Sequence, residues 1–183
     1  MSTEIKAHST SSGAVVGPQA GVSGLGALFN ELMEEHGYLT RLIARAIAAE
    51  TPEASENMYP ALRSTLLSHE QTEAMVLYGT LRQYSSAAQL VDAHARDEAE
   101  LEALIHSLDS LRATSSEWRV QLEALSALVR EHVRKEEDEF FPFARATLGE
   151  VASHDLRADY LRTKQGVANT VEADFAALSH QDG

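Results

Sequence analysis

The stretch REHVRKEEDEFFPFAR, residues 130–145, places two ionisable side chains on the apolar face of a predicted helix. The apolar pattern of this helix includes Val129 and returns at Phe140. His132 and Glu136 occupy the positions between them, about one turn apart, and therefore point toward the same interior. A buried imidazole and a buried carboxylate are costly unless another group compensates them. The stretch thus raises the question of what neutralises this pair.

Three other segments have the same interruption in an apolar pattern. His36 follows Phe29 and Leu32 in the first segment, and the others contain the His-x-x-x-Glu pairs at residues 69–73 and 94–98. A spacing of four puts the two side chains of each pair on one helical face. The seven inward-pointing residues are His36, His69, Glu73, His94, Glu98, His132 and Glu136.

Apolar residues recur at helical spacing in five segments of the chain. The predicted helices cover about residues 25–50, 56–84 (with a start at residue 60 as the alternative), 85–113, 114–148 and 153–179. The segment TPEAS separates the first two, TSSE from Thr114 forms a capping box, and Gly149 is expected to end the fourth helix, which Pro142 kinks or shortens. Short loops make sequential helices antiparallel, so we expect an all-α fold, an antiparallel up-down-up-down four-helix bundle. The fifth helix, interrupted by Gly166, should pack outside the bundle.

The domain organisation follows from the same patterns. Residues 1–23 are rich in Ser, Thr and Gly without a sustained apolar period, which predicts a disordered tail. We expect the bundle over residues 24–149 and the additional C-terminal helix over residues 150–183. A chain of 183 residues with 44% hydrophobic content is long enough for one well-filled domain.

The composition argues against several classes of partner. The chain has 28 acidic against 15 basic residues and a formal charge of −13, which repels nucleic acid and anionic lipid surfaces. It has no cysteine, so disulfides and thiolate ligands are excluded. No apolar run approaches the roughly 20 residues of a membrane span, and no signal pattern opens the sequence. A cytoplasmic location is the resulting expectation.

The four polar interruptions fall at one level of the predicted bundle. Counted from the turns, the two arms of each hairpin differ by one helical turn at most, at roughly 1.5 Å per residue. A single buried histidine is usually satisfied by a backbone carbonyl, and an isolated His-x-x-x-Glu pair is usually solvated. Four such interruptions in one layer are different, because their uncompensated burial exceeds the roughly 5 to 15 kcal/mol that stabilises a domain. We therefore predict a cation among them.

The number and charge of these ligands favour two cations. Seven ligands exceed the six of one octahedral ion, and two divalent ions bring +4 against −3 from the three glutamates. One bridging hydroxide brings the cluster to neutrality, and we expect an oxo or hydroxo bridge. Zinc in structural sites is usually tetrahedral and bound by cysteine, whereas mixed nitrogen and oxygen ligands at higher coordination favour iron. We expect two iron ions, Fe(II) or Fe(III), with manganese as the alternative.

The segments that carry these residues resemble the hemerythrin-like HHE cation-binding family. EEHGYLTRLI, residues 34–43, resembles its first-helix histidine segment, and HEQTEAMVLYGTL, residues 69–81, resembles its second-helix signature. HVRKEEDEFFPFAR, residues 132–145, resembles the fourth-helix signature, and the whole resemblance covers about residues 25–148. The chain departs from the family pattern at Ala74 and Gly79, and neither change removes a ligand. The resemblance implies a hemerythrin-like bundle.

The resemblance also implies a role for each candidate ligand. The four histidines would be terminal ligands, Glu73 and Glu136 would bridge the ions, and Glu98 would be an added carboxylate. Oxygen-carrying hemerythrins have His-x-x-x-His on the third helix, where this chain has His94 and Glu98. An anionic ligand stabilises the ferric state, which disfavours reversible oxygen carriage. The pattern H-HxxxE-HxxxE-HxxxE is similar to a subgroup that is linked to peroxide and nitric oxide chemistry.

Other residues are expected to have lesser roles. Tyr59 and Tyr78 could contact a ligand or the metal, with core packing the favoured interpretation, as it is for the aromatic residues Phe29, Phe140 and Phe141. We interpret Glu70 and Asp97 as neighbours of the site at most, because each is about 100° around its helix from the adjacent ligand. The residues expected to be solvated or structural are Glu137, Asp138, Glu139, His8, His106, His154 and His180.

Three classes of function are compatible with the sequence. The leading hypothesis is decomposition of hydrogen peroxide, or chemistry of peroxide with nitric oxide, at a di-iron centre in oxidative stress. The second is non-catalytic binding, sensing or storage of O2, NO or iron, and the third is a structural bundle with fortuitous histidines. We expect small molecules (H2O2, O2, NO) as partners, with no nucleic acid and no membrane. Protein partners and the oligomeric state stay open.

Overall fold

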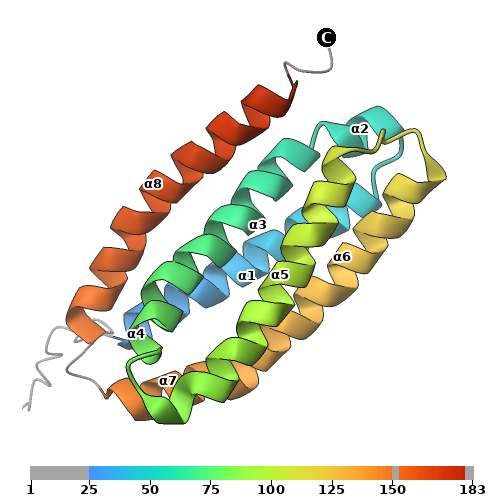
Figure 1. Ribbon diagram of the computed structural model, residues 1–183. Coiled ribbons are helices and arrows are strands. Elements are labelled where there is room, and N and C mark those ends of the chain that lie inside the picture. Colours follow the sequence, from blue (N-terminus) through green and yellow to red (C-terminus); the bar gives the residue numbers. More distant parts are fainter. Residues whose placement is uncertain (1–24, 150–152, 180–183) are drawn as a thin grey trace, which may run out of the picture.

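The computed structural model describes residues 25–149 and 153–179, which form helices and no strand (Figure 1). The all-α prediction is confirmed. The elements are α1 (Leu25–Ile47), α2 (Pro52–Glu56), α3 (Tyr59–Glu73), η1 (Ala74–Tyr78), α4 (Gly79–Leu81), η2 (Ser85–Ala87), α5 (Ala88–Asp109), α6 (Ser116–Lys135), η3 (Glu136–Phe140), α7 (Phe141–Leu148) and α8 (Ser153–Ser179). The predicted tail, residues 1–23, lies outside the described residues.

Four long helical segments form the predicted antiparallel bundle (Figure 1). They are α1, α3 with its continuations η1 and α4, α5, and α6 with its continuations η3 and α7. In the bundle α1 packs against α3 and α6, and α5 packs against α6 and, less extensively, against α3. The additional C-terminal helix, α8, runs along the outside of the bundle against α3 and α1. It is continuous through Gly166, so the expected interruption there was wrong.

Two apolar core clusters fill the bundle. One includes Tyr59, Leu62 and Trp118 near the α2 end, and the other includes Leu28, Tyr78 and the aromatic residues of η3 and α7 near the opposite end. The polar residues that interrupt the four apolar patterns lie between residues of these clusters along each helix. The apolar periodicity therefore serves both to build the bundle and to isolate one polar layer from water.

Local capping differs from the prediction at two loops. The segment TPEAS, expected as a plain break, contains the short helix α2, because the Thr51 side chain accepts a hydrogen bond from the Ala54 N–H. Ser115, rather than Thr114, is the N-cap of α6, and its hydroxyl accepts from the Trp118 N–H. Gly149 ends α7 with φ 66°, as the sequence predicted, because glycine adopts this conformation without strain.

Two π-helical turns interrupt the long helices, where the sequence predicted regular α-helix. In η1 the Gly79 N–H donates to the Ala74 carbonyl, and in η3 the Phe141 N–H donates to the Glu136 carbonyl. The expected irregularity at Pro142 is thus a widened turn just before the proline. Each π turn adds a residue and so places consecutive side chains, such as Leu77 and Tyr78, in the interior. Such turns are frequent at functional sites.

Within the described ranges, no helix is long and apolar enough to cross a membrane. The expected cytoplasmic location stays a prediction.

Candidate metal centre

The structure brings six of the seven predicted ligands together in the polar layer, where their side chains are buried. The seventh, Glu98, is partly exposed. Each of the four bundle helices contributes: His36 comes from α1, His69 and Glu73 from α3, His94 and Glu98 from α5, and His132 and Glu136 from α6 and the start of η3.

The ligands fall into two groups that share one carboxylate. The first, which we call the anchored group, comprises His36, His69, Glu73 and Glu136, and the second, the cavity group, comprises His94, His132 and Glu136. Within each group the ligand atoms lie within 4.8 Å of one another. Glu136 Oε2 lies 3.1 Å from His36 Nε2, and Glu136 Oε1 lies 3.2 Å from His132 Nε2. One carboxylate thus faces both groups, as a ligand bridging two ions would.

The nitrogen and oxygen atoms of this layer fit a metal because most of them have no hydrogen-bond partner among the described residues. A buried polar atom without a partner is costly, and metal coordination satisfies both imidazole and carboxylate lone pairs. The unpartnered atoms are His36 Nε2, His69 Nε2, both carboxylate oxygens of Glu73, His94 Nδ1, both ring nitrogens of His132, Glu98 Oε1, Glu136 Oε2 and Glu70 Oε2.

The electrostatics of the metal-free layer are unfavourable. Burial, and then the charges of Glu136 and Glu70, raise the pKa of Glu73 well above its usual range. Burial alone would lower the pKa of His132, but Glu70 and Glu136 outweigh it and raise the pKa to about 12. The pKa of Glu136 is well below its usual range because His132 and His36 outweigh burial. Without a cation, the layer therefore needs protons on some of these groups.

A comparison with protein families identifies this arrangement. Residues 27–144 match the family model of the hemerythrin HHE cation-binding domain. The chain belongs to this family. Comparisons with curated proteins and with solved structures give no match. The hemerythrin match spans all seven predicted ligands and ends before α8, which starts at Ser153. The family and the two clusters together support a metal-binding function, whereas the subgroup pattern stays a prediction.

Two histidines of the hemerythrin domain are held from behind by carboxylates. The Nδ1 of His36 lies 2.8 Å from Glu137 Oε1, and the Nδ1 of His69 lies 2.8 Å from Glu35 Oε2. Burial alone would raise the pKa of Glu35, but hydrogen bonds from His69 and Lys164 outweigh it and hold the pKa at about 2. Glu137 was expected to be only part of a solvated face. It is 36% exposed, yet one oxygen contacts a candidate ligand.

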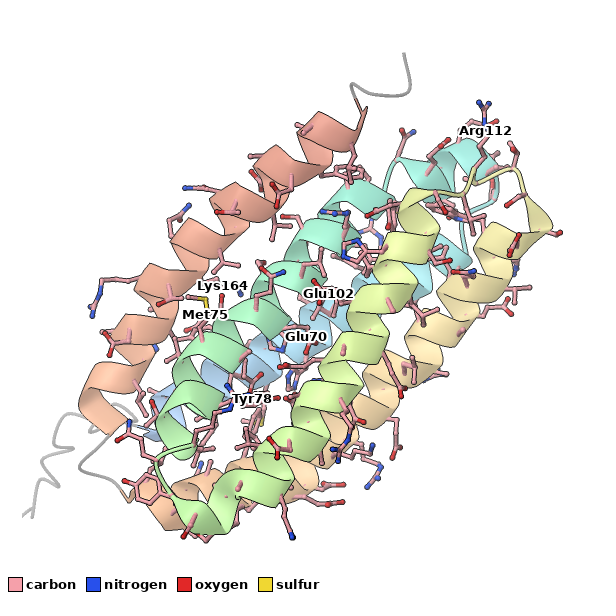
Figure 2. The ribbon with its side chains drawn as sticks, in the orientation of Figure 1. Glu70, Met75, Tyr78, Glu102, Arg112 and Lys164 are labelled. Atoms are coloured by element: carbon pink, nitrogen blue, oxygen red, sulfur yellow. The ribbon has the colours of Figure 1, made fainter. Side chains whose placement is uncertain are left out.

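Glu70 is the residue that sequence reasoning most underestimated. Its Oε2 lies 3.1 Å from His132 Nε2, nearly the distance at which Glu136 approaches the same nitrogen. Figure 2 shows Glu70 in the interior between α3 and α5. His69 and Glu70 are both buried, so the inward-facing side of α3 is wide enough to include two adjacent residues. The angle of about 100° between them therefore does not exclude Glu70 from the site. The hemerythrin centre therefore has an eighth candidate ligand.

Glu98 faces a small cavity instead of joining either cluster. The cavity, about 150 Å³, lies between α3 and α5 and is lined by Glu70, Glu98 and Glu102 among others. Burial, and then the charge of Glu70, raise the pKa of Glu98 to about 8. The ligand role of Glu98 stays a prediction, since neither group includes this residue, while its buried Oε1 has no hydrogen-bond partner among the described residues.

Of the two tyrosines considered, only Tyr78 is near the centre. Its hydroxyl donates to Glu136 Oε1 at 3.1 Å, and its place in the interior is visible in Figure 2. Tyr59 lies in the other part of the core, where its hydroxyl donates to the Ile105 carbonyl at 2.8 Å and to Asp109 Oδ1 at 2.7 Å. It therefore has a packing role.

Phe140 and Phe141, for which core packing was the favoured interpretation, lie against the ligand histidines as well as in the core. The ring centroids of Phe140 and His94 are 4.5 Å apart, and those of Phe141 and His36 are 5.8 Å apart. Phe141 also stacks on Phe29, with 4.7 Å between the ring centroids. These rings shield the ligands from water at one end of the layer.

Most of the other residues that the sequence predicts to be outside the ligand set lie away from both groups. Asp97 pairs with Lys135 at 2.7 Å, and His106 is 57% exposed. Asp138 and Glu139 are exposed. His8, His180 and the side chain of His154 lie outside the described residues.

Proposed function

We propose that the protein holds two iron ions in this layer and decomposes hydrogen peroxide. The observation that supports the proposal is the pair of buried ligand groups joined by Glu136, whose two oxygens face histidines of different groups at 3.1 and 3.2 Å. An arrangement of this kind is suited to two adjacent ions that exchange electrons with one small molecule.

The donor set favours iron and its oxidised state. The two groups offer imidazole nitrogens and carboxylate oxygens, and such mixed sets at higher coordination are typical of iron or manganese. Glu70, Glu73, Glu98 and Glu136 bring −4, which matches the +4 of two divalent ions. Carboxylates stabilise the ferric state over the ferrous state, so repeated oxidation by peroxide is favoured over reversible oxygen binding.

The ions, when bound, would supply the two electrons that reduce one peroxide molecule to water and recover them from a second, giving 2 H2O2 → 2 H2O + O2. The chain provides the access and the proton acceptors. The cavity of about 150 Å³ admits peroxide and a few water molecules, at about 30 Å³ each. Glu70 and Glu98 line it, and a carboxylate oxygen there can accept a proton from peroxide and return it to the departing water.

The surrounding residues protect the site. Tyr78 donates to Glu136 and so fixes the carboxylate that both groups share, while Phe140 and Phe141 cover the histidine rings. By covering the histidines, these side chains would exclude large molecules and limit the reaction to small oxidants. The same access would admit nitric oxide, which extends the proposal to reactions of nitric oxide with peroxide.

The test is oxygen evolution from peroxide by protein loaded anaerobically with ferrous iron. We expect turnover well above that of an equal concentration of free iron, and a loss of about 10- to 100-fold in Glu98→Ala. Glu100→Ala, an exposed position on the same helix, is the matched control and should keep wild-type turnover.

Two outcomes would end the catalytic proposal. One is turnover no faster than free iron, and the other is equal activity in the Glu98→Ala and Glu100→Ala variants. A reversible spectral change under oxygen or nitric oxide without turnover would instead favour the binding or sensing class, and stable iron content alone would favour storage.

A further inference from the structure

Helix α8 lies outside the segment that matches the hemerythrin family, yet one of its side chains reaches the metal centre. The Tyr160 hydroxyl is fully buried and donates to Glu35 Oε2 at 2.7 Å. The same oxygen lies 2.8 Å from His69 Nδ1, and the Tyr160 hydroxyl itself lies 3.4 Å from that nitrogen. Tyr160, Glu35 and His69 thus form a continuous network from α8 through α1 to α3.

A second residue of α8 completes the network. The Lys164 ammonium pairs with Glu35 Oε1, the oxygen that Tyr160 and His69 leave free. Figure 2 places Lys164 between α8 and the bundle. Lys164 is 23% exposed and Glu35 only 15%, so water screens their interaction weakly. Both carboxylate oxygens of Glu35 therefore accept from donors that α8 supplies.

The network decides which nitrogen of His69 faces the centre. An ionised carboxylate only accepts hydrogen bonds, so His69 Nδ1 must carry the proton that it donates to Glu35. The lone pair of neutral His69 is then on Nε2, which is buried, has no hydrogen-bond partner in the described part of the chain, and lies 3.7 Å from Glu73 Oε2. A carboxylate behind a ligating histidine also increases the basicity of the ring and fixes its orientation.

We propose that α8 is a working part of the metal centre, in which Tyr160 and Lys164 position Glu35 so that His69 presents Nε2 to the metal. Tyr160 and Glu35 are positioning residues, since they act through His69. The inference rests on the two-ion centre of the proposed function but does not depend on peroxide turnover. It assigns a role in metal binding to α8, a helix outside the segment that matches the hemerythrin family.

If Tyr160 only anchors α8 to the bundle, its loss should have a different effect on the protein. The same interface contains a second polar contact about one turn away, in which Arg157 of α8 pairs with Glu31 of α1 at 2.7 Å. This pair touches none of the candidate ligands. If Tyr160 and Glu35 only hold α8 on the bundle, breaking either contact should change stability alone. If they position His69, only the Glu35 contact should change the properties of the metal.

The experiment compares Glu35→Gln, Tyr160→Phe and the control Glu31→Gln. Each protein is loaded anaerobically with ferrous iron, titrated with a competing ferrous chelator, and its midpoint potential is measured. We expect Glu35→Gln to lower the affinity for one of the two ions by about 10- to 100-fold, with the control within about twofold of wild type.

The potentials should shift in opposite directions. Glu35→Gln removes the negative charge behind His69 and should raise the midpoint potential. Tyr160→Phe leaves that charge but removes one donor, so Glu35 accepts more strongly from His69 and the midpoint potential should fall. A structural anchor would not give opposite signs. Tyr160→Phe deletes only one hydroxyl, so it keeps the test usable if Glu35→Gln folds poorly.

The two proposals can fail separately. Wild-type affinity and potential in both Glu35→Gln and Tyr160→Phe would overturn the role of α8 while leaving peroxide turnover unaffected. Protein that binds two ions but evolves no oxygen would end the peroxide proposal. In that case the opposite shifts in potential would still support the network.

Discussion

The anchored group and the cavity group differ in what lies behind their histidines. In the anchored group, His36 and His69 each donate from Nδ1 to a carboxylate, Glu137 and Glu35 respectively, at 2.8 Å. In the cavity group, the Nδ1 atoms of His94 and His132 have no hydrogen-bond partner among the described residues. The two halves of one buried layer are therefore held with different rigidity.

From this difference we expect different roles for the two proposed ion positions. Carboxylate partners fix a histidine ring and raise its basicity, which strengthens metal binding and favours the oxidised ion. Among the residues that the structure describes, the Nδ1 atoms of the cavity group have no such partners. His132 of this group lies 3.1 Å from Glu70, which lines the cavity between α3 and α5. We expect the anchored position to retain its ion and the cavity position to exchange ligands with small molecules.

Removal of the shared ligand should have the largest effect, because it removes the feature that joins the groups. Glu136→Gln takes a negatively charged oxygen from both positions and leaves Tyr78 without its ionised acceptor. We expect the affinity for both ions to fall by more than about 100-fold, beyond the range for residues behind a ligand. Metal analysis after gel filtration measures this. Loss of one ion alone would show that Glu136 does not bridge.

Stepwise removal of metal from the wild-type protein should separate the two positions. The ion of the cavity group should leave first, at a chelator concentration about 10- to 100-fold lower than the ion of the anchored group needs. Chelator titration with metal analysis at each step gives two transitions. A single transition releasing both ions would contradict the difference in anchoring.

A smaller change is expected from Glu137→Gln, which weakens the anchored group from the solvent side. Glu137 is 36% exposed, whereas Glu35 is 15% exposed, so water already screens the interaction of Glu137 with His36. We expect a loss of metal affinity of about 10-fold, at the low end of the usual range. The neighbouring exposed change Asp138→Asn is the control, measured in the same chelator competition. A loss larger than that of Glu35→Gln would reverse the assigned order.

The sequence was sufficient for the fold and for most of the layer because both follow from periodicity. The polar residues at positions such as 36 and 132 interrupt apolar patterns. Short loops make the helices antiparallel, and the lengths of the helices then bring these positions into one layer of the bundle. The π turns were not predicted, since one extra residue per turn depends on tertiary packing rather than on local preference. Pro142 indicated an irregularity near the second of them but not its form.

The contacts behind the histidines could not be read from periodicity either. Glu35 and Tyr160 are 125 positions apart and meet only because α8 lies along α1 and α3. Glu70 was placed too far from the centre because a helical projection gives its angle but not the width of the space between α3 and α5. An acidic residue directly beside a predicted ligand, as at Glu35, Glu70 and Glu137, was the available signal for all three.

The smallest expected effect lies outside the layer and tests whether the metal centre is independent of the core cluster near α2. Tyr59→Phe removes a hydroxyl that donates to the Ile105 carbonyl and to Asp109. We expect a loss of about 1 kcal/mol in the free energy of unfolding of the metal-free protein, measured by urea denaturation. Metal affinity should stay within about twofold of wild type, because this hydroxyl contacts none of the candidate ligands.

Tyr78→Phe is the matched change in the other cluster, and there the affinity should fall, since its hydroxyl holds Glu136. Equal metal affinities in the two variants would mean that the layer responds to the core as a whole and not to its own hydrogen bonds.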